Sequence, residues 1–219
     1  MRLLAQPDIL RSAGLASVVS GLLCFPRLQA AQRYEEMLIF AVLMLFWCQF
    51  VLWAFVFAWE PAYGKAEPLT IQRNPKHWAL LMAGGVMVAG YQYFLVDPGY
   101  RAVAPNEYPY TFNAWWRQVL FTMAFSELFL CYAPLAFFVR LAQDEEWAMK
   151  LTVGFNVFFV AVKLFTMPQA PGAATIIALL ILRLGIAYAA VRLYRWSGIL
   201  AVSLLVLITQ SRHLLRVEF

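Results

Sequence analysis

The chain has 219 residues, of which 63% are hydrophobic and only 13% are charged, with a net charge of +5. A soluble domain carries roughly 25% charged residues and needs them on its surface, so this composition excludes a single soluble core, and it also excludes a disordered chain. Three cysteines and two histidines argue against a disulfide scaffold and against a histidine-rich metal centre. We therefore predict an all-α polytopic integral membrane protein, with no metal and no cofactor but with bound lipids.

Six segments are apolar over the roughly 20 residues that a helix needs to cross a bilayer. They are residues 37–59, 77–96, 118–139, 147–167, 173–194 and 197–215. An earlier segment, residues 9–25, is shorter and contains Arg11 and three serines, so it could span the membrane, re-enter it or lie at its surface. The sequence predicts a helical bundle with six or seven transmembrane helices.

Basic residues between the spans indicate the orientation of the chain. With seven spans, nine lysines and arginines fall on the side of the N-terminus and six on the other side, which favours a cytoplasmic N-terminus. We expect the protein to be localised in a bacterial inner (cytoplasmic) membrane. No polar segment interleaves basic residues with stacking aromatics, so we predict membrane lipids and other membrane subunits as partners, and no nucleic acid.

A few polar side chains lie inside the predicted spans, where burying one charge costs at least ~2.5 kcal/mol. We predict that they form a polar seam inside the bundle, made of Ser126, Glu127, Asn156, Lys163 and Arg183. In the simplest arrangement Glu127 pairs with Lys163 or Arg183, because a paired charge is tolerated better than a lone one. The alternative is that Lys163 and Arg183 reach towards the membrane surfaces.

Three short motifs follow one another along the last four predicted spans: SELFLC at residues 126–131, FVAVK at residues 159–163 and LITQS at residues 207–211. The last is preceded by YRWSGIL at residues 194–200. Their order and spacing resemble those of the CPBP family of intramembrane CAAX-prenyl proteases and bacteriocin-processing enzymes, which carries EExxxR, FxxxH and HxxxN. The resemblance covers about half of the chain. It implies a four-helix core over residues 112–219, preceded by N-terminal helices and loops over residues 1–111.

The catalytic positions of that family are mostly replaced here. Glu127 and Phe159 match the motifs, whereas the differing positions hold Ser126, Cys131, Lys163, Leu207 and Ser211. The family's chemistry needs a carboxylate that activates water and donors that bind the developing charge, which serine and lysine do not supply. The resemblance therefore implies a pseudo-enzyme. We predict a non-catalytic structural or accessory subunit that assembles or stabilises a larger membrane complex.

Two other classes of function are the alternatives. One is an intramembrane protease or an exosortase-like transpeptidase, with Glu127, Cys131, Arg183 and His213 as candidate catalytic residues. A nucleophilic cysteine needs a base and a cation nearby, but Cys131 lies in Leu-Cys-Tyr-Ala-Pro rather than in the Ala-Cys-Ser/Thr-Gly of exosortase-like enzymes. The other is a transporter, or a subunit that contacts pigment or quinone. It is less favoured, because the chain shows no repeat and Pro134 is the one break within a strong span.

Tryptophans mark the candidate contact surfaces with other subunits. They are Trp47 and Trp53 in the predicted span at residues 37–59, and Trp115 and Trp116 just before the predicted span at residues 118–139. Aromatic residues are enriched at protein interfaces. A cluster before a span is also typical of the aromatic belt at the membrane surface.

Overall fold

The computed structural model describes residues 2–32, 34–64, 68–70 and 75–217. Within this part of the chain there are helices and short connections but no β-strand, which confirms the predicted all-α bundle. Six helical runs are long and apolar enough to cross a membrane: Pro7–Ala31, Glu35–Tyr63, Pro75–Val103, Phe112–Ala142, Glu145–Thr166 and Ala173–Arg216. The segment at residues 9–25 belongs to the first of these runs, so it is a helix of spanning length.

Several of these runs change helix type along their length. The α-helices are α1 (Pro7–Ala31), α2 (Glu35–Tyr63), α3 (Pro75–Tyr91), α4 (Asp97–Val103), α5 (Phe112–Phe121), α6 (Ala133–Ala142), α7 (Glu145–Thr166) and α8 (Ala173–Ser211). Three π-helical segments join them, η2 (Gln92–Val96), η4 (Thr122–Ser126) and η5 (Leu128–Tyr132). Short 3₁₀ segments are η1 (Arg2–Ala5), η3 (Pro105–Glu107) and η6 (Arg212–Arg216). π-Helical turns are rare and occur often at functional sites.

Two helices begin at capping side chains rather than at the edge of an apolar stretch. Thr111 Oγ1 accepts a hydrogen bond from the Ala114 backbone N–H at 3.2 Å, and the Asp144 carboxylate accepts one from Trp147 at 2.9 Å. Such caps satisfy donors at a helix N-terminus that have no partner within the helix. As a result α5 begins at Phe112, six residues before the predicted span, and it includes Trp115 and Trp116.

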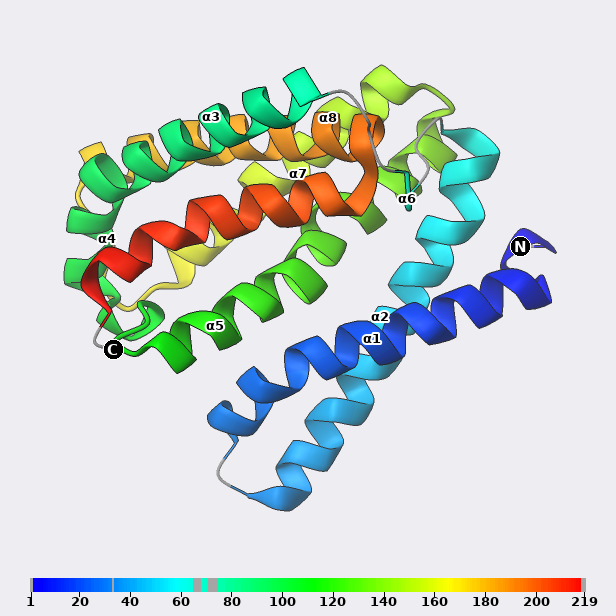
Figure 1. Cartoon of the computed structure of the whole chain (residues 1–219), viewed down its shortest axis with the longest axis horizontal. Coiled ribbons are helices and arrows are strands. Elements are labelled where there is room, and N and C mark those ends of the chain that lie inside the picture. Colours follow the sequence, from blue (N-terminus) through cyan, green and yellow to red (C-terminus); the bar gives the residue numbers. More distant parts are fainter. Residues whose placement is uncertain (1, 33, 65–67, 71–74, 218–219) are drawn as a thin grey trace.

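The last helix, α8, is bent back on itself at Gly198. The backbone there has φ +66° and ψ −162°, a conformation that glycine adopts at low cost. The turn is held by a hydrogen bond of 2.9 Å from the Ile199 backbone N–H to the carbonyl oxygen of Pro68. The predicted spans at 173–194 and 197–215 are therefore two arms of one element, which lie side by side in Figure 1.

The main core lies where α2, η5, α6, α7 and both arms of α8 meet. Its largest members include Tyr132 and Tyr194, whose ring centroids are 4.7 Å apart. On the other side of α8, Gly85 of α3 permits a close approach, because a Cβ at this position would lie 2.9 Å from the side chain of Ile208. The helices of the predicted N-terminal part thus pack directly on those of the predicted core.

Helices α1 and α2 form a hairpin at one side of the molecule (Figure 1), in which α1 also packs on α5 and α2 also packs on α6. The buried residues of α2 all lie in its second half, from Gln49 onwards. Its first half exposes a run of large apolar side chains, among them Phe40 and Trp47. This half of α2 is therefore packed against α1 but not against the bundle.

The two termini lie at opposite ends of the bundle (Figure 1). Three of the basic residues counted for orientation, Arg33, Lys65 and Arg73, lie outside the described residues. The orientation itself stays a prediction.

Candidate functional site

Two polar clusters lie inside the bundle, and the first contains most of the predicted seam. Arg183 Nη2 on α8 donates a hydrogen bond of 2.5 Å to Asn156 Oδ1 on α7. Asn156 Nδ2 in turn donates to the carbonyl oxygens of Leu130, at 2.6 Å, and of Thr152, at 2.8 Å. Leu130 belongs to the π-helical segment η5, so Asn156 links an irregular part of one span to Arg183 on another.

Glu127 lies between the two π-helical segments η4 and η5 and is buried. Arg183 acts on it electrostatically, but in the described part of the chain Glu127 has no direct ion pair. The predicted contact of Glu127 with Lys163 is not formed. Lys163 lies three residues before the end of α7, so its long side chain reaches beyond the helix end and pairs with Glu107 at 2.5 Å. Ser126 is the last residue of η4 and is partly buried.

The candidate catalytic residues fall into two separate environments. Cys131 is buried, and the charged groups that act on it are Glu127, Glu60 and Arg183. His213 lies in η6, where its ring meets that of Tyr108 edge-on with centroids 5.3 Å apart. Neither Glu127 nor Arg183 is among the charged groups acting on His213. The structure thus places Cys131 beside Arg183 and Glu127, and it places His213 in the second cluster.

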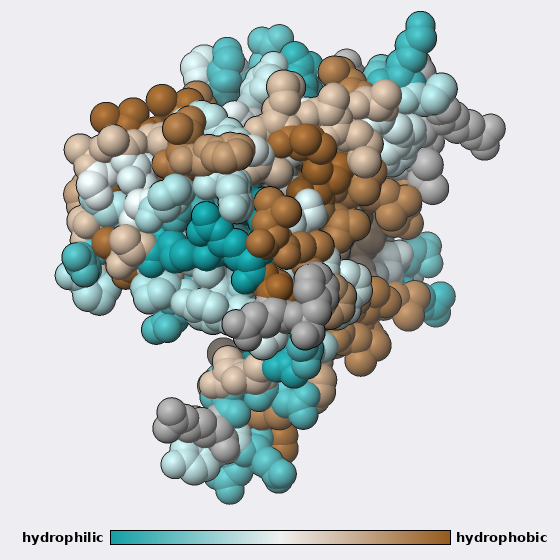
Figure 2. Space-filling model, turned by 60° about the vertical axis from the view of Figure 1, so that its left-hand side comes forward, coloured by the Kyte–Doolittle hydropathy of each residue, from teal (hydrophilic) through white to brown (hydrophobic). Residues whose placement is uncertain are grey.

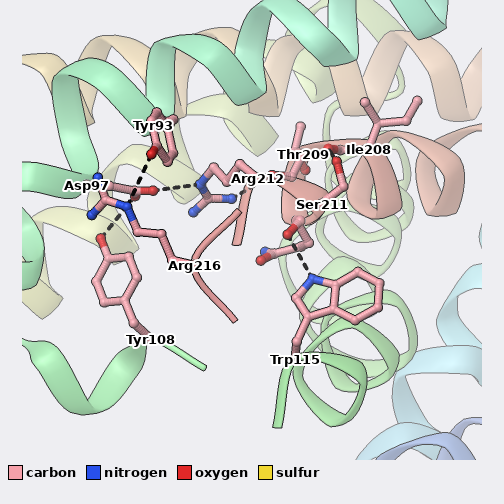
Figure 3. A network of polar contacts seen from close by, with 10 residues as sticks. Tyr93, Asp97, Tyr108, Trp115, Ile208, Thr209, Ser211, Arg212 and Arg216 are labelled. Carbon is pink, nitrogen blue, oxygen red and sulfur yellow. Dashed lines mark hydrogen bonds and ion pairs between the residues drawn. The ribbon is translucent and has the colours of Figure 1, made fainter. Parts of the chain in front are cut away.

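The second cluster, drawn in Figure 3, lies where α4 meets η6, the last helical segment of the chain. Asp97 of α4 accepts hydrogen bonds from Arg212 Nε at 3.1 Å and from the Tyr108 hydroxyl at 3.0 Å. The Asp97 and Arg212 side chains are only 4% and 11% exposed. Burial and the neighbouring Asp97 carboxylate raise the pKa of Tyr108 well above its usual range, so its hydroxyl stays protonated and donates.

A second ion pair borders the same cluster. Glu107 accepts hydrogen bonds from Lys163 and, at 3.2 Å, from the Tyr100 hydroxyl. The side chains of Lys163 and Glu107 are 45% and 43% exposed, so water screens this pair more than the Asp97–Arg212 pair. Figure 2 shows hydrophilic side chains gathered on the face that contains this end, bordered by hydrophobic ones.

These groups surround a cavity of about 200 Å³. The cavity is lined by residues from segments far apart in the sequence. Its polar and ionisable lining residues include Gln92, Asp97, Glu107, Lys163, Arg212 and His213. Glu127 does not line this cavity, although Lys163 does.

The sequence interpretation missed three polar residues. Asp97 and Glu107 lie between the predicted spans at residues 77–96 and 118–139, and hydropathy alone does not show that α4 folds back onto the helix ends. Glu60 stood just beyond the predicted 37–59 span, yet it is 1% exposed near the end of α2 and faces the ion pair between Arg195 and Glu145. An acidic residue at the edge of an apolar stretch was the available signal for Glu60.

The four candidate tryptophans are divided between interior and surface. Trp53 is buried and its Nε1 donates to Ser20 at 3.0 Å, while Trp115 Nε1 donates to the carbonyl oxygen of Gln210 at 2.8 Å. Trp47 and Trp116 are exposed. Only the latter two are placed to contact another subunit.

No family model, no curated protein and no solved structure matches the chain. Within the described residues, no group of three or more histidine, cysteine or acidic side chains is placed to hold a metal ion.

Proposed function

We propose that this chain is a non-catalytic integral membrane subunit, a pseudo-enzyme with a CPBP-like core, that helps to assemble or stabilise a larger membrane complex. One observation carries the proposal: three polar side chains of the predicted seam, Arg183, Asn156 and Lys163, are engaged with one another, with the backbone or with Glu107. Arg183 binds Asn156, Asn156 binds two carbonyl groups, and Lys163 binds Glu107. Groups held in this way stabilise helix packing and are not free to act on a substrate.

The separation of Cys131 and His213 supports the same conclusion. Nucleophilic catalysis needs a base within hydrogen-bond reach of the nucleophile. The charged groups that act on Cys131 are Glu127, Glu60 and Arg183, and those that act on His213 are Arg212 and Arg101. A Cys/Arg/His triad is therefore a weaker interpretation of these residues than two structural clusters.

The surface for a partner is the first half of α2. It carries Phe40 and Trp47, which are 65% and 59% exposed, on a half of the helix that contains no buried residue. Helices associate in membranes by close side-chain packing, and aromatic residues are enriched where proteins meet. We expect a transmembrane helix of another subunit to lie along this half of α2.

Site-specific photo-crosslinking in the native membrane tests this role. A photoreactive amino acid replaces Trp47 in one variant and Phe158, on α7, in a matched control of similar exposure, 64% against 59%. The expected result is a discrete protein adduct from position 47 and lipid adducts alone from position 158. Lipid adducts alone from both positions would contradict the proposal.

A further inference from the structure

A groove of about 360 Å³ lies between α3 and the first arm of α8, which pack against each other along the bundle (Figure 1). Most of its walls are apolar: Leu81 and Val88 come from α3, and Ile186 and Ala189 come from α8. The volume falls within the roughly 300–1,000 Å³ of sites that bind small molecules. The groove is therefore large enough to hold part of an apolar ligand.

Gly84 keeps the groove open at its floor. A Cβ added at this position would have no other atom within 4 Å, and Gly84 lines the groove. The neighbouring Gly85 has a different role, because a Cβ there would lie 2.9 Å from the side chain of Ile208. Gly85 thus allows α3 to approach the second arm of α8, whereas the missing side chain at Gly84 leaves space for a ligand.

One end of the groove combines aromatic rings with an arginine. The His77 ring stacks on that of Trp196, with centroids 5.9 Å apart. The Arg192 guanidinium lies 5.5 Å from the centre of the Tyr188 ring and 5.7 Å from that of Trp196, and its Nε donates to the Tyr188 hydroxyl at 3.1 Å. His77 is near the start of α3 and Trp196 is near the bend in α8. Tryptophan and tyrosine are enriched at the level of the lipid headgroups, which places this end at the membrane surface.

The charge at this end is positive. Among the described residues that line the groove, Arg192 is the one charged side chain, and no ion pair within the described chain includes it. Arg195, less than one turn further along α8, is already paired with Glu145. Lys76, next to His77 at the start of α3, is also basic. The aromatic rings around Arg192 carry no formal charge, so this end of the groove complements an anion.

The length of the groove matches one leaflet of a bilayer. The part of α3 from His77 to Val88 rises roughly 16 Å, at about 1.5 Å per residue. The hydrocarbon core is about 30 Å thick, so the acyl chains of one leaflet extend over roughly 15 Å. An acyl chain whose headgroup lies beside Arg192 would therefore run along the apolar part of the groove.

We infer that this groove binds an anionic glycerophospholipid. One acyl chain lies in the apolar part over Gly84, and the terminal N–H groups of Arg192 donate to the phosphate, whose geometry a guanidinium matches. Basic pockets between membrane helices bind lipid headgroups in this way. A zwitterionic lipid brings a second positive charge towards Arg192, and like charges repel, so the anionic lipid is preferred.

Photolabelling of the full-length protein in phosphatidylcholine nanodiscs tests this inference. A trace of phosphatidylglycerol with a photoreactive group in one acyl chain is added, and the adducts are mapped by mass spectrometry. The same group on phosphatidylcholine provides the comparison. We expect the phosphatidylglycerol probe to label residues 81–88 and 186–193 about tenfold more than the phosphatidylcholine probe does, and both probes to label α7 equally.

Arg192→Gln tests the contact with the headgroup. It should lower labelling of the groove by the phosphatidylglycerol probe about tenfold, because a charge-assisted hydrogen bond to phosphate is lost. Arg140→Gln is the matched control. Arg140 is also half-buried, with its guanidinium 4.9 Å from the centre of the Tyr63 ring, but it does not line the groove. Labelling of the groove in this control should equal that in the wild type.

Gly84→Leu tests the position of the acyl chain. The leucine side chain fills the open floor and should reduce labelling of the groove by both probes. Gly90→Leu is the matched control, because Gly90 is also on α3 with no other atom within 4 Å of its Cβ position, and it does not line the groove. Leucine favours a helix more than glycine does, so both variants should fold.

Three results would overturn the inference. The first is equal labelling of the groove by the two probes. The second is labelling by the phosphatidylglycerol probe that neither Arg192→Gln nor Gly84→Leu reduces. The third is an absence of adducts from the groove, as expected when a partner helix or an uncharged quinone fills it.

Discussion

Asp97 and Arg212 form an ion pair that is almost fully buried, and its partners depend on each other. We predict that Asp97→Asn lowers the free energy of unfolding by about 3–5 kcal/mol, because it leaves the Arg212 guanidinium buried without a counter-charge. Replacing both residues by apolar ones of similar volume, Asp97→Leu with Arg212→Met, should recover most of this loss. A double-mutant cycle measured by unfolding in detergent gives the coupling between the two side chains.

The exposed ion pair between Lys163 and Glu107 provides the control for that experiment. Glu107→Gln breaks the contact with Lys163, which water already screens, so it should lower the free energy of unfolding by about 1 kcal/mol or less. A loss in Asp97→Asn no greater than in Glu107→Gln would show that the buried pair does not hold this end of the bundle together.

The sequence located the charged residues of the seam more reliably than their partners. Burial cost alone indicates that Glu127 and Arg183 face the interior, and both do. Their contacts depend on how neighbouring spans are rotated and on where connections fold back. Lys163 therefore pairs with Glu107, from a connection that hydropathy assigns to a loop, and Arg183 pairs with Asn156.

At the scale of elements, the bend in α8 determines how the last two predicted spans pack. We predict that Gly198→Ala strongly destabilises the protein, by more than the roughly 1 kcal/mol of an ordinary glycine substitution. The new Cβ would lie 2.6 Å from the Pro68 carbonyl oxygen and 2.7 Å from that of Thr70, on a backbone with positive φ. Melting temperature in detergent measures the effect.

Gly154→Ala is the matched control, because Gly154 lies inside α7 with no other atom within 4 Å of its Cβ position. This substitution should raise stability by roughly 0.5–1 kcal/mol, since alanine favours the helix. Equal and small effects at both glycines would mean that the bend does not depend on the residue at 198.

Apolar stretches predict the presence of the helices well and their ends poorly. Each predicted span lies within one of the six long helical runs, apart from Met167, which follows the end of α7. The helices extend further because capping residues such as Thr111 and Asp144, and not hydropathy, determine where they start. The π-helical segments around Glu127 have no signature in hydropathy, because they alter hydrogen bonding without altering composition.

At the scale of the whole molecule, most helices contribute to the packed interior, but the first half of α2 does not. Helices α3 to α8 pack around the two polar clusters, whereas the first half of α2, in the hairpin at one side of the molecule (Figure 1), contains no buried residue. A membrane subunit that holds its charged groups in internal contacts and presents an unsupported helix is suited to association with another helix rather than to catalysis.

The most direct test of the proposed role as a subunit of a membrane complex uses the full-length chain extracted into a mild detergent. The mass of the particle that contains the chain is measured, and the co-purified polypeptides are identified. The account predicts a particle heavier than the 25.0 kDa chain, with a second membrane protein in fixed ratio. It would be contradicted by a monodisperse single chain that cleaves a membrane peptide and loses this activity on Cys131→Ala or Glu127→Ala.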